Sequence, residues 1–251
     1  MLKFTCRILQ VASLIVFPVA LALAAEGDLA DKDDMLRLLK LRLGTDQIEP
    51  LRETRAAGVY QTRFGNQFAY LIDGGRYVFI GEMVDLQMAQ NLTEVSRREL
   101  VTSALAEFPE DSVIVFPARE TELAVLNVFT DTSCGYCQKL HTEVKYLQEA
   151  GISVRYFPYP RGGSRGPGYS DLQRVWCSED RLQAMSIAKR SAEGSLQQDS
   201  ACSRAQAIDE GYLLGNSLGI KGTPALFAGD GTTFAGYVPY QQLIPQLLSA
   251  Q

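Results

Sequence analysis

The spacing of hydrophobic residues in the first third of the chain predicts a helix followed by a small antiparallel sheet. Residues 31–43 place three leucines on one face, as an amphipathic helix does, and the aspartates of the first turn suit the positive end of the helix dipole. Gly44 is expected to end this helix. Strands are predicted where short runs rich in Tyr, Phe, Val and Ile are separated by Gly-Asn and Gly-Gly pairs, at residues 59–64, 67–73 and 76–80.

The core of this first unit is thin. A helix with three or four strands in roughly 60 residues buries little apolar surface, and units of that size are often completed by a partner. Homodimerisation through this part of the chain is therefore one expectation. The alternative is that the unit packs on the rest of the same chain.

Residues 91–108 predict a connecting helix. Thr93 is a candidate N-cap, charged residues fill the middle, and the apolar residues form only a weak stripe. We expect this helix to join the first unit to the second.

The second unit has a different order of elements. A strand at 123–129, a helix from about Cys134 to Ala150 and a strand at 152–157 form a β-α-β unit. Two helical stretches, a hairpin and a last helix from Tyr240 follow, which predicts a mixed sheet with helices on both faces. The fold class is thus α+β for the first unit and α/β for the second. The glycine-rich residues 161–168 are expected to form a mobile connection.

The first 24 residues predict a signal peptide. Lys3 and Arg7 precede an uncharged stretch, and Ala22-Leu23-Ala24 is the small-x-small pattern at which a signal peptidase cuts. A membrane anchor is the alternative, but spanning needs ~20 apolar residues and this stretch is shorter and contains a proline. The mature chain is expected to be soluble in an exported compartment, because no second apolar run of spanning length follows.

Composition and charge exclude several functions. The chain has 251 residues, 46% hydrophobic and 21% charged, which is unlike a collagen, a coiled-coil rod or a disordered tail. The formal charge is −5, and loss of Lys3 and Arg7 with the signal peptide makes it −7. We therefore expect no nucleic-acid partner and no broad attraction to an anionic membrane.

The cysteines carry the candidate chemistry. Cys6 leaves with the signal peptide, and an even set of four remains, which in an oxidising compartment indicates disulfides or redox chemistry. Cys134 and Cys137 form a CxxC pair directly after an apolar strand, where the first turn of a helix lowers the pKa of a thiol. Cys134 is then the attacking thiolate, and Cys137 can close a disulfide with it or resolve a mixed disulfide.

A zinc site and an inert structural disulfide are the alternative roles for this pair. A zinc site needs two more ligands, and only His141 and a widely separated cysteine pair are available. An inert structural disulfide does not explain the position at a helix start. No metal and no cofactor is therefore expected. His141 is either a charge or proton partner of the thiols or a side chain on the helix surface, and Asp131 is expected to cap the helix.

Two further features stay ambiguous on spacing alone. Cys177 and Cys202 lie 25 positions apart and form either a structural disulfide or a second redox pair. A disulfide that closes a loop of this length stabilises the fold by roughly 3 kcal/mol in the chain-entropy model. Thr223-Pro224, just before a strand, is expected to be trans, because only ~5% of X-Pro bonds in folded proteins are cis.

The order of motifs adds a resemblance. CGYC after LNVFTD, then KLH, VRYFPYPR, VWC, a further Cys and GTPALF resemble the bacterial periplasmic thiol:disulfide isomerases of the DsbC/DsbG family. The resemblance implies a signal peptide, an N-terminal dimerisation domain, a linker helix and a thioredoxin-like catalytic domain with a helical insertion. These are expected at residues 1–24, 25–88, 89–109 and 110–251.

The same resemblance implies roles for individual residues. Cys134 would be the nucleophile, Cys137 would resolve, and Cys177 would pair with Cys202. Thr223-Pro224 would be cis and would bind substrate with Gly135 and Tyr136. The implied partners are a second copy in a V-shaped homodimer, misfolded exported proteins in an apolar cleft, and a membrane reductant of the DsbD type.

Departures from thioredoxin favour disulfide shuffling over general reduction. The CxxC interior is Gly-Tyr instead of Gly-Pro, and Val128 stands where thioredoxin has a buried Asp. The alternatives are a dithiol oxidase, a DsbG-like isomerase with narrower clients, and a holdase chaperone whose thiols are incidental. Gly135 argues against the DsbG type, which carries Pro at that position. The glycine-rich stretch from Gly162 to Gly168 is longer than the resemblance to the family leads us to expect.

Overall fold

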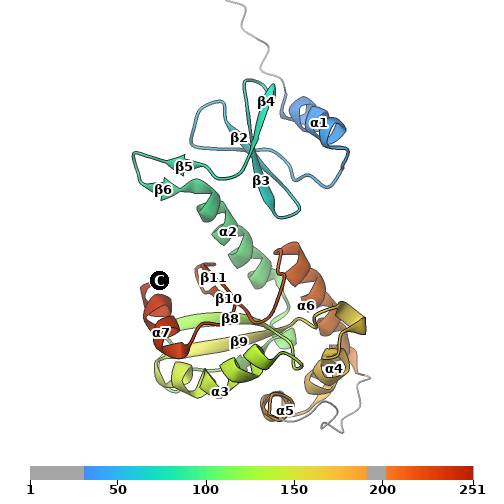
Figure 1. Ribbon diagram of the computed structural model, residues 1–251, viewed down its shortest axis with the longest axis vertical. Helices are drawn as coiled ribbons and strands as arrows, with labels where there is room; N and C mark the ends of the chain where they lie inside the picture. Colours follow the sequence, from blue (N-terminus) through green and yellow to red (C-terminus); the bar gives the residue numbers. More distant parts are fainter. Residues whose placement is uncertain (1–30, 191–201, 251) are drawn as a thin grey trace, which may run out of the picture.

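The computed structural model describes residues 31–190 and 202–250, and it forms two parts joined by one long helix (Figure 1). The predicted signal peptide and Cys6 lie outside the described residues. Within the described ranges, no helix is both long and apolar enough to cross a membrane.

The N-terminal part is a helix beside an antiparallel sheet, as predicted. Helix α1 (Lys32–Leu43) ends at Gly44, whose φ of 65° is the left-handed conformation that glycine adopts without strain. Met35 and Leu39 of α1 pack on Ile48 and Leu71 to form a small core. The four strands lie in the order β1 (Arg52–Glu53), β2 (Tyr60–Phe64), β3 (Gln67–Ile72) and β4 (Tyr77–Ile80).

The hydrophobic pattern of the sequence does not predict the shortest strands. The pattern missed β1 and also β5 (Val84–Asp85) and β6 (Gln90–Asn91), which pair with each other. Each of these strands has two residues, too few to show an alternation of apolar and polar positions.

Helix α2 (Leu92–Glu107) runs from the N-terminal sheet to the C-terminal part (Figure 1). Its N-cap is Asn91, whose Oδ1 accepts a hydrogen bond from the Glu94 amide at 3.0 Å, so the prediction of Thr93 as N-cap was wrong. Thr93 is buried instead, and its hydroxyl accepts from the Met83 amide at 2.8 Å. That contact ties the start of α2 to the N-terminal part.

The C-terminal sheet is mixed, as predicted. Strands β8 and β9 pair in parallel and all other pairs are antiparallel. The strand β7 was not predicted, because three residues give no clear period. The order is β11 (Thr233–Phe234), β10 (Ala225–Ala228), β8 (Ala124–Thr130), β9 (Ile152–Pro158) and β7 (Ile114–Phe116).

Helices cover both faces of this sheet. On one face, Leu126 of β8 shares a core with Leu140 and Leu243 from two of the helices. On the other face, Phe129 and Phe157 pack with residues of α2 and α6. The helices of this part are α3 (Gly135–Glu149), α4 (Tyr169–Cys177), α5 (Arg181–Ala188), α6 (Gln206–Ser217) and α7 (Tyr240–Ser249), with short 3-10 turns at Glu110–Ser112, Gly163–Arg165 and Ser203–Ala205.

Candidate active site

The CxxC pair lies at the start of α3, directly after the short turn that follows β8. Cys134 is the N-cap residue of α3, and its carbonyl accepts a hydrogen bond from the Gln138 amide at 3.0 Å. Cys137 lies one turn inside the helix. Both thiols are free and buried, with 3% and 1% of each residue exposed. This is the placement that the strand-then-helix pattern predicts.

The two thiols have opposite tendencies to ionise. The pKa of Cys134 is lowered to about 5, first because the Cys137 side chain hydrogen-bonds to it and further by the Thr223 side chain, the Cys137 amide and the charge of Arg161. Burial raises the pKa of Cys137, and the neighbouring Cys134 raises it further. At neutral pH the pair therefore holds one thiolate, on Cys134, and one thiol, on Cys137.

A cis peptide bond joins Thr223 to Pro224 next to the dithiol. The expectation of a trans bond, drawn from frequencies alone, was wrong, and the conformation implied by the resemblance is the one present. Sγ of Cys134 lies 3.2 Å from the Thr223 carbonyl oxygen. The Thr223 hydroxyl is buried and has no hydrogen-bond partner among the described residues, and Thr223 helps to lower the pKa of Cys134.

An ion pair between buried Asp131 and partly exposed Arg161 supports the turn before Cys134. Asp131 is fully buried, and its Oδ2 accepts from the amide and from Nε of Arg161 at 2.9 and 3.1 Å. Its Oδ1 accepts from the amide of Ser133, which precedes the helix. The expectation that Asp131 caps α3 was therefore wrong, because its side chain holds the turn and the arginine instead.

The glycine-rich stretch from Arg161 to Gly168 is packed against this ion pair. A Cβ on Gly168 would come within 2.0 Å of Oδ1 of Asp131, and one on Gly166 within 2.1 Å of the Arg161 carbonyl oxygen. The stretch predicted to be a mobile connection is therefore closely packed, and it contains a 3-10 turn at Gly163–Arg165. The glycines at these positions allow close approach of the backbone to the side chain that positions the turn.

The side chain of His141 contacts two hydroxyl groups and is not a charged partner of the thiols. Its ring nitrogens lie 3.0 Å from the Tyr156 hydroxyl and 3.1 Å from the Ser186 hydroxyl. Burial lowers the pKa of His141 to about 4, with a further effect from the charges of Lys189 and Arg190. The imidazole is neutral at neutral pH and belongs to a half-buried polar network, so neither a charged partner nor a surface side chain describes it.

The two residues between the cysteines differ in what they present. Tyr136 is 62% exposed, and its ring stacks on that of Tyr237 with centroids 5.8 Å apart. Gly135 is exposed, and a Cβ there would meet no atom within 4 Å. The surface beside Cys134 thus combines an aromatic face with an open stretch of backbone.

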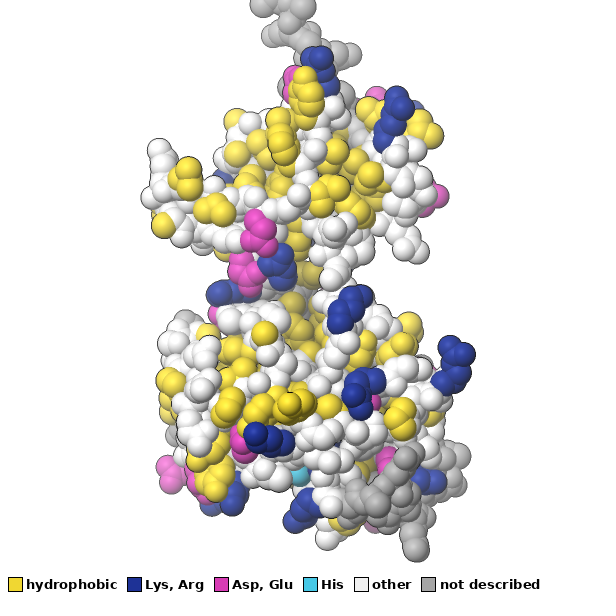
Figure 2. All heavy atoms as spheres, in the orientation of Figure 1, with side chains coloured by type: hydrophobic (Ala, Val, Ile, Leu, Met, Phe, Trp, Pro, Cys, Tyr) yellow, Lys and Arg dark blue, Asp and Glu magenta, His cyan; other side chains and the backbone are white. Residues whose placement is uncertain are grey.

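A cavity of about 390 Å³ opens beside Thr223 and Pro224. Phe227 and Leu100 are among its apolar walls, and Phe68 reaches it from the N-terminal sheet. Hydrophobic side chains also gather on the N-terminal part and at the waist between the two parts (Figure 2). Apolar surface therefore continues from the cis-proline loop toward the N-terminal sheet.

The other two cysteines of the described residues form a disulfide, the pairing that the resemblance implies. Cys177 and Cys202 are joined with an S–S distance of 2.05 Å. Cys177 is the last residue of α4, and Cys202 precedes the 3-10 turn before α6. The bond thus fastens the helical insertion at both ends.

A dithiol at the start of a helix, on a mixed sheet and beside a cis-proline, defines a thioredoxin-like thiol-disulfide oxidoreductase. Residues 113–251 match the thioredoxin-like domain, and residues 26–94 match the disulfide bond isomerase protein N-terminal domain. The chain belongs to the DsbC family of thiol:disulfide interchange proteins. The predicted fold class and family are confirmed.

The similarity to relatives extends over nearly the whole chain. The chain is 31% identical over 227 residues to the thiol:disulfide interchange protein DsbC of Dickeya dadantii, covering 90% of this chain and 91% of that relative. It is 30% identical over 227 residues to DsbC of Escherichia coli K12, covering 88% and 90%. A linker-deletion variant of Proteus mirabilis ScsC is similar in fold alone, with a TM-score of 0.50, 23% identity, and coverage of 63% and 86%.

Two basic residues of the site were not predicted. Arg161 directly follows a predicted strand and a Pro-Tyr-Pro run, a position that could have marked it as close to the sheet edge. Lys189 is buried with its Nζ 2.7 Å from Oγ1 of Thr130. Nothing in the local sequence distinguishes it from a solvated lysine at the end of a helix.

Proposed function

We propose that the reduced protein isomerises wrong disulfides in exported proteins through Cys134 and Cys137. The observation that carries this proposal is the free dithiol at the start of α3, beside the cis bond of Thr223-Pro224. The lowered pKa of Cys134 and the raised pKa of Cys137 support these roles. The Cys134 thiolate attacks one sulfur of a substrate disulfide, a mixed disulfide forms, and the other substrate sulfur leaves as a thiolate.

The mixed disulfide has two fates. A different substrate thiolate can attack the substrate sulfur, which leaves the substrate with a rearranged disulfide and returns Cys134 as a thiolate. Alternatively, Cys137 attacks Cys134, which releases the substrate reduced and closes the disulfide between the two cysteines. The first route is isomerisation without net electron transfer, and the second is reduction.

Substrate backbone is proposed to lie between the cis-proline loop and the start of α3. Thr223 and Pro224 border Cys134 on one side, while Gly135 and Tyr136 present open backbone and an aromatic face on the other. The apolar cavity beside Pro224 suits a hydrophobic side chain of an unfolded client.

A homodimer is proposed through the N-terminal part, at residues 25–88. Strand β4 is an edge strand, and all four of its apolar residues are exposed, from 42% at Val78 to 59% at Phe79. An exposed apolar edge is a template for pairing with another strand. With residues 89–109 as linker and 110–251 as catalytic domain, two copies would face each other in a V and enclose a cleft.

The proposed place of action is the periplasm. Export would depend on the signal peptide at residues 1–24, with cleavage near Ala24. A dithiol that must stay reduced in an oxidising compartment needs a source of electrons, so a membrane reductant of the DsbD type is the proposed partner.

The test uses purified mature protein, reduced beforehand, and fully oxidised ribonuclease with scrambled disulfides. Recovery of ribonuclease activity is compared for the wild type, Cys134→Ala and Cys137→Ala. We expect no recovery with Cys134→Ala and partial recovery with Cys137→Ala, because substrate thiols can resolve the mixed disulfide. No recovery by the wild type, with fast oxidation of reduced ribonuclease by the oxidised protein, would show a dithiol oxidase.

The double variant Cys134→Ala/Cys137→Ala separates isomerisation from a holdase activity. The apolar cavity beside Pro224 favours binding of unfolded chains, so the double variant is expected to suppress aggregation while it fails to isomerise. Full loss of both activities would show that binding depends on the thiols.

A further inference from the structure

Lys189 is a buried lysine that has no part in the reaction described above. It directly follows α5 and is 3% exposed. Its Nζ donates hydrogen bonds to Oγ1 of Thr130 and to the carbonyl oxygen of Asp131, each at 2.7 Å. Both acceptors lie at the end of β8, just before the turn to Cys134. Lysine is almost never buried in this way unless its charge has a partner.

The carboxylate of Asp131 is not that partner. Its two oxygens accept hydrogen bonds from the amide of Ser133 and from Arg161. Lys189 donates to the main-chain carbonyl oxygen of Asp131 and not to its carboxylate. Asp131 therefore orients the amine but its charge is already matched by the guanidinium of Arg161.

The other groups around Lys189 point to Cys137. The Asp131 carbonyl that accepts from Lys189 also accepts from the Cys134 amide at 3.2 Å. Tyr156, whose ring centroid lies 6.0 Å from Nζ, has its hydroxyl 3.0 Å from the ring of His141, one turn after Cys137. In agreement with this placement, Cys137 has the largest effect among the charges that act on the lysine, ahead of Asp131, Cys134 and Arg161. Of the other neighbours, His141 and Tyr156 are neutral, since burial lowers the pKa of His141 and raises the pKa of Tyr156. Arg190, the next residue in the chain, adds a second positive charge, but its side chain is exposed.

The interaction is mutual. The positive charge of Lys189 lowers the pKa of Cys137 and so opposes the effect of burial. Burial also lowers the pKa of Lys189, to about 8, which leaves the amine mostly charged at neutral pH. The lysine thus supplies a positive charge on the buried side of the dithiol, where solvent cannot.

We propose that Lys189 is a positioning residue for the resolving step: its buried ammonium group stabilises negative charge on the Cys137 sulfur as that sulfur attacks the mixed disulfide on Cys134. The inference rests on the proposed roles of the two cysteines. In this step a bond forms between the two cysteine sulfurs and the bond from Cys134 to the substrate sulfur breaks. The substrate sulfur leaves with the electron pair, and the proton of Cys137 passes to it or to water.

The two steps can be timed separately with a small aromatic disulfide whose released thiolate absorbs visible light. Attack by Cys134 releases the first equivalent, and attack by Cys137 releases the second. The Cys137→Ala variant must lose the second phase, which assigns it. We expect Lys189→Met, and Lys189→Gln with its hydrogen-bond donors kept, to slow the second phase at least tenfold at pH 7. Lys189→Arg, which keeps the charge, is expected to restore most of the rate.

A pH profile separates an electrostatic role from a structural one. Loss of the charge is expected to move the rise of the second-phase rate to higher pH, whereas a merely loosened fold would change its amplitude without that shift. Lys145→Met removes a lysine from the exposed face of α3 and serves as the matched control. The first phase checks that each variant is folded.

Three outcomes are distinct. A second phase that slows in Lys189→Met and Lys189→Gln but not in Lys145→Met supports the inference. An unchanged second phase in a variant with a normal first phase overturns it. A first phase that persists in Cys134→Ala overturns the proposed function itself.

Discussion

At the scale of single residues, the difference between the two thiols comes from their surroundings. Cys134 ends a turn, and its pKa is lowered first by the Cys137 side chain and further by the Thr223 side chain, the Cys137 amide and the charge of Arg161. Cys137 lies one turn deeper, where burial favours the neutral thiol. Two identical side chains, three positions apart, thereby differ in pKa, as the proposed roles of nucleophile and resolving group require.

The contribution of Thr223 can be measured directly. Thr223→Val removes the hydroxyl that helps to lower the pKa of Cys134 to about 5. The thiolate then forms at higher pH, so the midpoint of alkylation by iodoacetamide against pH is expected to rise by several tenths of a unit or more. Thr142→Val, which removes a hydroxyl from the exposed face of α3, is expected to leave the midpoint in place. Equal midpoints in all three proteins would show that the hydroxyl has no effect on the thiolate.

The same thiolate couples stability to pH. Because the folded pKa of Cys134 lies below that of an unfolded thiol, the reduced protein gains stability at alkaline pH and loses it as pH falls toward about 5. Urea unfolding of the reduced protein and of Cys134→Ala is expected to show a difference that shrinks from pH 9 to pH 5. A difference that grows over that range would contradict the direction of the pKa shift.

At the scale of elements, the sequence predicted what depends on neighbours along the chain. The CxxC pair after an apolar strand, the helix that follows it and the parallel strand beyond are local patterns, and they were confirmed. Lys189 and the contact between Thr223 and Cys134 depend on elements that are far apart in sequence. Burial of a lysine is a property of the packed fold, and no spacing rule reports it.

The glycine-rich stretch from Arg161 to Gly168 shows that a high glycine content can have two different structural causes. The composition of this stretch predicts a mobile connection. In the structure, Gly166 and Gly168 are needed because backbone and the Asp131 carboxylate occupy the space of a side chain. Flexible loops and close approach both favour glycine, so only the neighbouring atoms tell the two apart.

Gly168→Ala therefore tests the packing of this stretch. Its Cβ would overlap Oδ1 of Asp131, so we expect a loss of about 1–3 kcal/mol in the free energy of unfolding, the usual cost of overpacking. Gly229→Ala is the control, because a Cβ there makes only ordinary contacts of 3.8 Å or more. Urea unfolding of the two variants measures the difference, and equal losses would exclude a special role for the ion pair.

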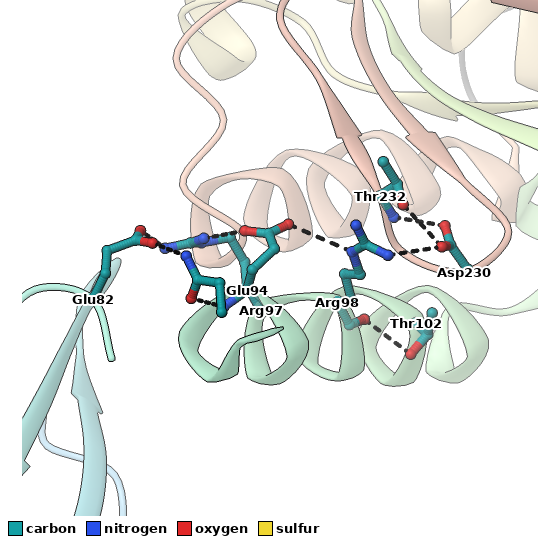
Figure 3. Close-up of polar contacts among 8 residues, drawn as sticks. Glu82, Glu94, Arg97, Arg98, Thr102, Asp230 and Thr232 are labelled. Atoms are coloured by element: carbon teal, nitrogen blue, oxygen red, sulfur yellow. Dashed lines mark hydrogen bonds and ion pairs between the residues drawn. The ribbon is translucent and has the colours of Figure 1, made fainter. Parts of the chain in front are cut away.

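At the scale of the whole molecule, helix α2 fixes how the catalytic part is held relative to the N-terminal sheet. Arg97 contacts Glu82 and Glu94, and Arg98 pairs with Asp230 in the β10–β11 turn at 3.1 Å (Figure 3). A Cβ on Gly231 would come within 2.4 Å of the Arg98 carbonyl oxygen, so this turn also packs closely on the α2 backbone. The linker helix is thus anchored to both parts by polar contacts.

The anchoring pair is partly exposed, so its contribution is modest. Asp230→Ala is expected to lower the free energy of unfolding by about 0.5–1 kcal/mol at low salt, and high salt is expected to reduce the difference, because ions screen exposed charges. Thermal unfolding at two salt concentrations measures both. A loss that does not depend on salt would point to the hydrogen bonds of Asp230 with Thr232 instead of the ion pair.

The exposed strand β4 links the architecture to the kind of substrate that can be isomerised. A small disulfide needs only one dithiol, whereas an unfolded protein needs apolar surface around it, and a second copy would supply that surface. Phe79→Glu places a charge on the edge that a dimer would bury. We expect light scattering to show a monomer, recovery of scrambled ribonuclease to fall at least tenfold, and reaction with the small aromatic disulfide to stay unchanged.

The matched control is Leu213→Glu, which places the same charge on an apolar residue that is 66% exposed on α6. It is expected to keep both the dimer and the recovery of ribonuclease. If the Phe79→Glu protein remains a dimer, the dimer interface does not include β4. A monomer that still restores ribonuclease would separate isomerisation from dimerisation, and the cavity beside Pro224 would then be sufficient to hold a client.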